Sequence, residues 1–195
     1  IKTVWKVKNL SNLGKGVRLK RIFRDNGKTV IVAMDHSQGG AVPGLEKPLE
    51  AIKKVAAGGA DAVLIPLGTL RKFYDKIPRD LGLVLSIPPD PRYIEIAVKA
   101  GAHLVKNTFF GSLRDRERLS LLGPLAIECE KWGMPLLGEI VPQDENRKSI
   151  YETSVIKNAA RIGFEYGSDV IKTSYTGSAA TLREVVEACP IPVTM

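Results

Sequence analysis

From residue 29 onward, short runs of aliphatic and β-branched residues alternate with longer stretches that have an amphipathic helical pattern. The short runs predict strands at 29–35, 62–67, 81–87, 103–108, 135–141, 169–173 and 192–195. The helical patterns cover 45–57, 91–100, 114–132, 150–166 and 179–188. Most predicted strands are apolar on both faces, as buried parallel strands are. We therefore expect an α/β protein built from repeated strand–helix units.

Two architectures use such units: an open doubly wound sheet and a closed (β/α)₈ barrel. The segment after the first predicted strand contains glycines, but not the G-x-G-x-x-G spacing of a dinucleotide-binding sheet. Polar or charged residues stand instead at the C-terminal ends of four predicted strands, namely Asp35, Lys106, Glu139 and Lys172. Barrel enzymes keep their chemistry at this end of the strands, so the predicted fold is a (β/α)₈ TIM barrel.

The predicted strands number seven, and the sequence ends on the seventh. A closed barrel of this type needs eight, because an open one leaves unpaired strand edges. We therefore expect a barrel that is C-terminally incomplete as given, with strand eight absent. The alternative is that residues 4–7 form a further strand.

The net charge of +8 comes entirely from the start of the chain. Residues 1–28 hold nine basic side chains and one acidic, whereas residues 29–195 hold 20 of each. The sequence thus predicts a basic N-terminal leader segment, 1–28, and a barrel domain, 29–195. Such a leader can bind RNA or an anionic surface, or can be a solvated terminal segment. No aromatic and basic surface of the RNA-recognition type accompanies it, so we do not expect nucleic acid as a partner.

The chain has neither the apolar run of ~20 residues that a membrane helix needs nor a signal-peptide pattern at its start. Cys129 and Cys189 are too few for a disulfide framework and are expected to be reduced core thiols. Metal-ligand spacings such as H-x-x-x-H or C-x-x-C are also missing from the sequence. These features predict a cytoplasmic protein without a membrane partner, a metal or an organic cofactor.

Lys172 is the most informative candidate for chemistry. It ends an apolar strand, where a charged side chain is costly and the neutral amine is favoured. A neutral amine in a pocket can attack a carbonyl group and form a Schiff base. The alternative is a strand-end lysine that reaches solvent or pairs with an acid. Lys106, if it points to the same place, would disfavour charge on Lys172 further.

Two carboxylates at strand ends, Asp35 and Glu139, are candidates for proton transfer during the making or breaking of a carbon–carbon bond. Asp35 could instead cap the loop that follows it. His36 could act as a base or contact the substrate, although a lone histidine more often stabilises a loop.

Three stretches resemble the archaeal-type class I aldolases: the opening, with 18–23, 27–36 and 43–46, the strand 169–177, and the stretch 189–193. This family includes archaeal fructose-bisphosphate aldolase, aminodideoxyheptulosonate synthase and a thiolase that acts on a phosphorylated autoinducer. The resemblance implies a barrel that is usually oligomeric, with Lys172 as the Schiff-base lysine and Asp35 as a proton-transfer group. It also implies that the segment from Asp35 to Gly39, with His36, Ser37 and Gln38, lines the substrate site.

The sequence departs from this family's pattern in three places. Its aldolases carry a tyrosine proton donor followed by Pro and Arg, where this chain has Val141, Pro142 and Gln143. Ser37 stands where a glycine is usual, and the family's phosphate-binding loops would lie beyond Met195.

The resulting prediction is a metal-independent, Schiff-base aldolase or related transferase that acts on a phosphorylated ketose-like substrate. Lys172 attacks the carbonyl, Asp35 moves protons, and Glu139 or a water replaces the tyrosine. We expect a homo-oligomer. The alternatives are a thiolase-like enzyme and a non-catalytic barrel whose basic leader binds RNA or a partner.

Overall fold

The computed structural model describes residues 10–195, so the possible strand at 4–7 lies outside the described residues. The chain divides into two compact units. The first runs up to Ile87 and also includes Arg92–Val105 and Trp132–Met134. The second consists of Pro88–Pro91, Lys106–Lys131 and Pro135–Met195.

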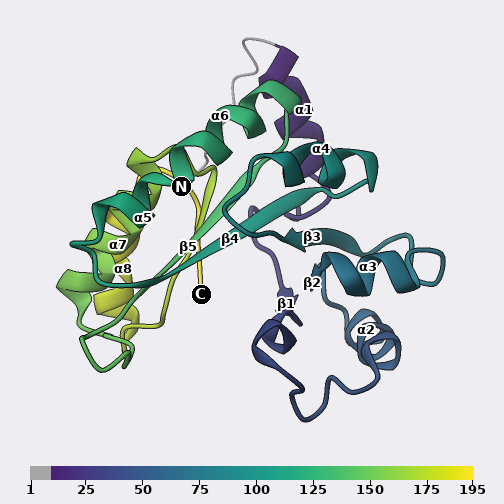
Figure 1. The fold of residues 1–195 in the computed structure, drawn as a ribbon, viewed down its shortest axis with the longest axis horizontal. Helices are drawn as coiled ribbons and strands as arrows, with labels where there is room; N and C mark the ends of the chain where they lie inside the picture. Colours follow the sequence, from purple (N-terminus) through teal and green to yellow (C-terminus); the bar gives the residue numbers. More distant parts are fainter. Residues whose placement is uncertain (1–9) are drawn as a thin grey trace. The chain divides into compact units, whose positions relative to one another are not determined.

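The first unit contains parallel strands and the helices that follow them (Figure 1). Its elements are α1 (Leu10–Leu19), β1 (Ile31–Ala33), the 3₁₀ helix η1 (His36–Gly39), α2 (Pro48–Ala57), β2 (Ala62–Pro66), α3 (Leu67–Phe73), β3 (Gly82–Ser86) and α4 (Arg92–Lys99). Strand β2 pairs in parallel with β1 and with β3. All five residues of β3 are buried, and four of the five of β2 are, because these strands have apolar neighbours on both faces.

The described part of the predicted leader is packed into the first unit. Leu19 and Ile22 are buried, with 7% and 1% exposure. Three arginines bind backbone carbonyls of the same unit: Arg18 donates to Gly133 O (3.0 Å), Arg21 to Arg79 O (2.8 Å) and Arg24 to Gly59 O (3.3 Å). The described part of this segment therefore packs into the first unit through Leu19, Ile22 and these three arginines.

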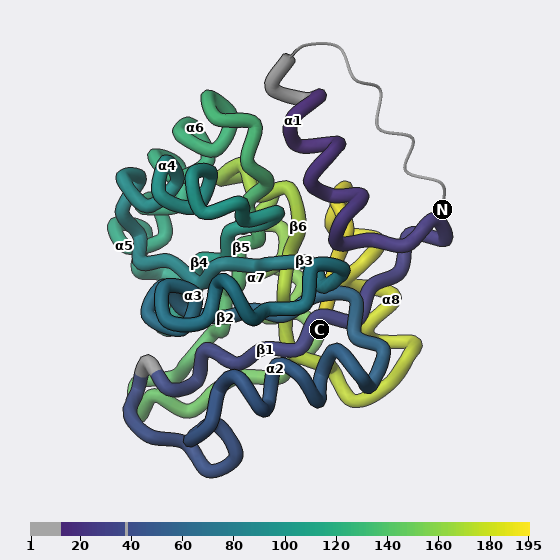
Figure 2. Tube along the Cα trace, turned by 90° about the vertical axis from the view of Figure 1, so that its right-hand side faces the viewer, coloured from purple at the N-terminus to yellow at the C-terminus, as the bar shows by residue number. Residues whose placement is uncertain are grey.

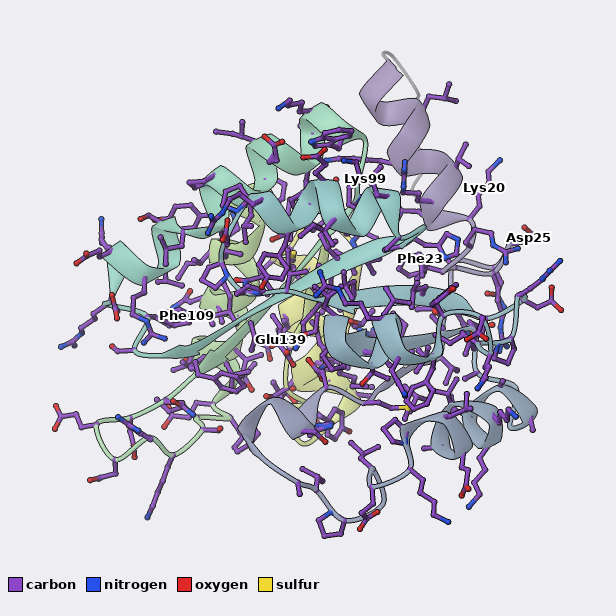
Figure 3. All side chains as sticks on the ribbon, turned by 45° about the vertical axis from the view of Figure 1, so that its right-hand side comes forward. Lys20, Phe23, Asp25, Lys99, Phe109 and Glu139 are labelled. Carbon is purple, nitrogen blue, oxygen red and sulfur yellow. The ribbon has the colours of Figure 1, made fainter. Side chains whose placement is uncertain are left out.

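A close backbone approach explains how this segment meets β3. A Cβ atom at Gly82 would lie 2.6 Å from the carbonyl oxygen of Arg21 and 3.0 Å from that of Asp61. No side chain fits there, so glycine lets residues 20–24 cross the start of β3. Figure 2 follows this part of the chain from α1 into β1, and Figure 3 labels Lys20, Phe23 and Asp25 along it. The sequence-based boundary at residue 28 stays a prediction.

The second unit contains the C-terminal strands. Strand β4 (Leu104–Gly111) begins in the first unit and continues here, followed by α5 (Arg116–Ser120), α6 (Leu122–Trp132), β5 (Leu136–Pro142), α7 (Thr153–Glu165), β6 (Val170–Lys172), α8 (Ala179–Glu187) and β7 (Val193–Thr194). Strands β5, β6 and β7 pair in parallel, in that order. Helices α7 and α8 pack against β6 through a buried cluster of Ile156, Ala160, Ile171, Val185 and Cys189.

All seven predicted strands occur within the described residues, and their order in the sheet follows the chain from β1 to β7. The predicted helix at 114–132 is instead two helices, α5 and α6, separated at Leu121. Pro124 explains the interruption, because proline lacks the amide hydrogen that a continuous helix needs. Helices α1 and α3 were not expected. Among the described residues, no helix combines the length and apolarity needed to cross a lipid bilayer.

Candidate active site

Three strands of the second unit bring three charged side chains together. Lys106 lies on β4, Glu139 on β5 and Lys172 at the end of β6. The parallel register of β5 and β6 places Glu139 directly opposite Lys172. Because side chains alternate along a strand, residues paired in this way project from the same face. Figure 3 shows Glu139 and the side chains around it.

The Glu139 carboxylate connects the two lysines. Lys172 Nζ donates a hydrogen bond to Oε1 of Glu139. The other oxygen, Oε2, is 2.8 Å from Lys106 Nζ and accepts a hydrogen bond of 2.8 Å from Thr108 Oγ1. Lys106 was expected to act directly on Lys172. The structure shows that each of them contacts Glu139.

Burial differs across this cluster. The exposed fraction is 5% for the Lys106 side chain, 11% for Glu139 and 26% for Lys172. Burial by itself raises the pKa of Glu139, but the positive charges of Lys106 and Lys172 outweigh it, and the pKa lies below its ordinary value. Glu139 is therefore an ionised, buried carboxylate. Of the two lysines that contact it, Lys172 has the more accessible side chain.

Asp169, just before β6, contacts the start of β5 beside this cluster. Its carboxylate accepts a hydrogen bond of 2.8 Å from the amide of Leu136, and its own amide donates to the Leu136 carbonyl, also at 2.8 Å. On the opposite face, a Cβ at Gly138 would collide with Ser168 Oγ, so glycine permits the close packing of β5 there. These contacts join β5 to residues 168 and 169, next to the pair of Glu139 and Lys172.

Asp35 belongs to the first unit, where it follows β1. It is 8% exposed and accepts a hydrogen bond of 2.7 Å from Ser86 Oγ at the end of β3. Asp35 directly precedes η1, and its side chain makes no capping hydrogen bond to that helix. Ser86 was not among the predicted residues, although its place at a strand end is the signal that identified the others.

The other predicted binding residues fall into two groups. His36, Ser37, Gln38 and Gly39 form η1 in the first unit. Ser37 lines a cavity of about 440 Å³ together with Met34, Gly40, Ala41, Val42, Leu45, Glu46, Pro48 and Thr69. Val141 and Pro142 end β5 in the second unit, and Gln143 forms an antiparallel bridge with Ser149. Val141 has no group that can donate a proton.

Among residues 10–195, no three or more His, Cys, Asp or Glu side chains are grouped so that they could hold a metal ion. The absence of a cofactor stays a prediction.

Thr108 is a site residue that was not predicted from the sequence. Its position two residues after Lys106 on the same strand is the signal that could have identified it.

Comparison with known proteins identifies the family. The sequence pattern of the DeoC/LacD family aldolases matches residues 29–195. The chain belongs to this family. It is 33% identical to 2-amino-3,7-dideoxy-D-threo-hept-6-ulosonate synthase 1 of Archaeoglobus fulgidus, over 93% of this chain and 72% of that protein. It is 30% identical to the synthase of the same kind from Halobacterium salinarum, over 94% of this chain and 74% of that protein.

A solved structure confirms the architecture. The fold matches that of an archaeal fructose-1,6-bisphosphate aldolase with its catalytic lysine bound to a carbinolamine intermediate, with a TM-score of 0.77 and 23% identity, over 93% of this chain and 79% of that one. The predicted TIM-barrel class is confirmed, and this chain has strands β1 to β7 of it. The prediction of an aldolase-type enzyme is confirmed as well.

Proposed function

We propose that this aldolase-family chain forms a Schiff base between Lys172 and a phosphorylated ketose-like substrate, and that it makes or breaks the adjacent carbon–carbon bond. The hydrogen bond from Lys172 Nζ to the Glu139 carboxylate carries the proposal. It joins a partly exposed amine to a buried, ionised acceptor on the neighbouring strand.

The first step is addition of the amine. The neutral Lys172 nitrogen attacks the carbonyl carbon, and a proton passes from nitrogen to the carbonyl oxygen, which gives a carbinolamine. Glu139 is placed to carry that proton because it contacts Nζ. The carbinolamine hydroxyl then takes up a proton and leaves as water, and the nitrogen–carbon iminium remains.

The second step is cleavage, or its reverse. The electron pair of the neighbouring carbon–carbon bond moves to the iminium and forms an enamine, while the hydroxyl on the departing carbon loses its proton and becomes an aldehyde. We assign that proton to Asp35, a buried carboxylate fixed by Ser86. In the resemblance described above, a tyrosine acts as a proton donor at the position of Val141. Val141 has no proton to donate, so we assign the donor role to Glu139 or a water.

Lys106 supports this chemistry through charge. It is buried and remains beside Oε2 of Glu139 when the amine of Lys172 becomes neutral. One positive charge therefore continues to stabilise the carboxylate throughout the addition step.

The names of the relatives support the substrate class. One is a synthase of an aminodideoxyheptulosonate, and the other is an aldolase of fructose 1,6-bisphosphate. Both names describe the chemistry of multi-carbon carbonyl compounds, and the second names a phosphorylated ketose.

Two further expectations are proposals of the same kind. Exposed apolar side chains in the second unit, including Phe110 and Ile127, would be covered in a homo-oligomer. Both cysteines are buried and neither is in a disulfide, which suits a reducing compartment such as the cytoplasm. Sedimentation of the full chain measures the first of these properties.

Borohydride trapping tests the proposed function. The full chain is incubated with fructose 1,6-bisphosphate or dihydroxyacetone phosphate, reduced with borohydride and mapped by peptide mass. We expect an adduct on Lys172 that Lys172→Met abolishes and that Lys148→Met, a matched exchange at an exposed loop lysine, leaves intact. An adduct on a different lysine, or none with any carbonyl compound, overturns the proposal.

A further inference from the structure

The Glu139 carboxylate has different partners on its two oxygens. Oε1 accepts from Lys172, while Oε2 is held by Lys106 Nζ and Thr108 Oγ1, each at 2.8 Å. A carboxylate that rotated about its terminal bond would exchange these oxygens. The contacts at Oε2 therefore determine whether Oε1 stays directed at the reacting amine.

Thr108 differs from Lys106 in what it can contribute. Its hydroxyl donates one directional hydrogen bond, whereas an ammonium group attracts either oxygen from a range of directions. Thr108 is β-branched, so its side chain has little rotational freedom on strand β4. It is also neutral, and its hydrogen bond persists whatever the protonation state of Lys172.

Strand geometry explains why Thr108 reaches the same oxygen as Lys106. The two residues are two positions apart on β4 and so project from the same face. Both then meet Glu139 of β5 from the same strand. Oε2 is thus held by one charged and one directional donor.

We propose that Thr108 is a positioning residue that holds Oε2 of Glu139 and so keeps Oε1 directed at Lys172 for proton transfer. The inference rests on the proposed Schiff-base chemistry. Without the hydroxyl, Glu139 can turn toward Lys106 with both oxygens. Imine formation then slows. Substrate affinity changes little, because the Thr108 hydroxyl is engaged with Glu139.

The test compares Thr108→Val, which keeps the shape and removes the hydroxyl, with Thr108→Ser, which keeps the hydroxyl. We expect Thr108→Val to slow the single-turnover rate of borohydride-trappable adduct on Lys172 by about tenfold, since a hydrogen bond to a charged group is lost. Thr108→Ser keeps the hydroxyl, and its rate should lie within about threefold of the wild-type rate. The KM for fructose 1,6-bisphosphate is unchanged in both variants. Thr153→Val, the same exchange on helix α7, leaves the rate at its wild-type value.

A second measurement needs no turnover. Carbon-13 NMR of glutamate-labelled protein follows the carboxyl titration of Glu139, assigned by its loss in Glu139→Gln. Thr108→Val raises the pKa of Glu139 because the ionised form loses a donor, and Thr108→Ser does not. If Thr108→Val does not fold, Thr108→Ala takes its place in both measurements.

The outcomes separate the two proposals. If the wild-type protein gives no Lys172 adduct, the proposed function is refuted. The NMR titration then still tests whether Thr108 holds the Glu139 carboxylate. A Thr108→Val protein that keeps the wild-type titration of Glu139 overturns the positioning role. A rate of trapping equal to that of the wild type overturns it as well.

Discussion

Glu139 on β5 stands directly opposite Lys172 on β6, and its carboxylate accepts a hydrogen bond from the lysine amine. The pairing follows from strand register, which makes it a property of the backbone as much as of the two side chains. A lysine that must lose a proton to react therefore has its acceptor built into the neighbouring strand. Loss of either partner or of the register should affect the same chemical step.

Glu139→Gln should affect both stability and reactivity. Lys106 is 4% exposed, and its ammonium group lies beside the Glu139 carboxylate. The exchange replaces that negative charge by a neutral amide. Breaking a buried pair in this way costs about 3–5 kcal/mol, so the free energy of unfolding falls by that amount. Trapping of substrate on Lys172 falls at least about 100-fold, the scale of general acid–base catalysis. Urea unfolding and borohydride trapping measure these effects, and a variant with wild-type values of both would contradict them.

Acidification should weaken the fold through the same residue. The folded pKa of Glu139 lies below its ordinary value, despite burial, because of Lys106 and Lys172. Such a carboxylate contributes stability above its unfolded pKa of about 4.3, and this contribution is lost as the pH falls through the folded pKa. The difference in unfolding free energy between the wild type and Glu139→Gln should therefore shrink below about pH 4.3. Urea titrations between neutral and acidic pH measure it, and a difference independent of pH would exclude this contribution.

Asp169 should control the register. Asp169→Ala removes the acceptor of the Leu136 amide at a buried site and should cost about 1–3 kcal/mol. It should also slow trapping on Lys172, because β5 and β6 lose the contact that aligns Glu139. Asp169→Asn keeps one oxygen acceptor and should be affected less. If Asp169→Ala were as unstable as predicted but trapped substrate at the wild-type rate, the register would not depend on Asp169.

Ser86→Ala should separate the two chemical steps. The exchange removes the hydrogen bond to Asp35 Oδ2, which we assign to proton transfer after the iminium has formed. Turnover should therefore fall by about tenfold, the scale of one hydrogen bond to a charged group, while the rate of adduct formation on Lys172 stays the same. Single-turnover borohydride trapping measures the rate of adduct formation, and a steady-state assay measures turnover. An equal loss in both would place Asp35 in the addition step.

The strands could be predicted from the sequence because buried parallel strands are almost continuously apolar, as 62–67 and 81–85 are. Charged residues at the ends of other predicted strands also identified Lys106, Glu139 and Lys172. In the structure Lys172 ends β6, whereas Lys106 and Glu139 lie within β4 and β5. Which of them touch could not be predicted, because register depends on contacts such as that of Asp169 with Leu136. From the sequence, Lys106 was expected to disfavour charge on Lys172 if both point to the same place. In the structure Glu139 contacts both lysines.

The packing of the basic segment could not be predicted for a related reason. Charge pattern alone predicts solvation, but arginine side chains can bind backbone carbonyls that the sequence does not reveal. Arg18 and Arg21 do so, at Gly133 and Arg79. Helix α1 was missed because the charge of this segment dominated its interpretation.

Ile22→Ala tests whether this segment belongs to the fold. Ile22 is 1% exposed and follows α1, so its truncation leaves a cavity in the first unit. The free energy of unfolding should fall by about 2–5 kcal/mol, the range for isoleucine to alanine in a core. Val17→Ala, at a 60% exposed position of α1, is the matched control and should change stability by less than about 0.5 kcal/mol. If Ile22→Ala were as stable as the wild type, residues 10–28 would be a dispensable extension, as a solvated leader would be.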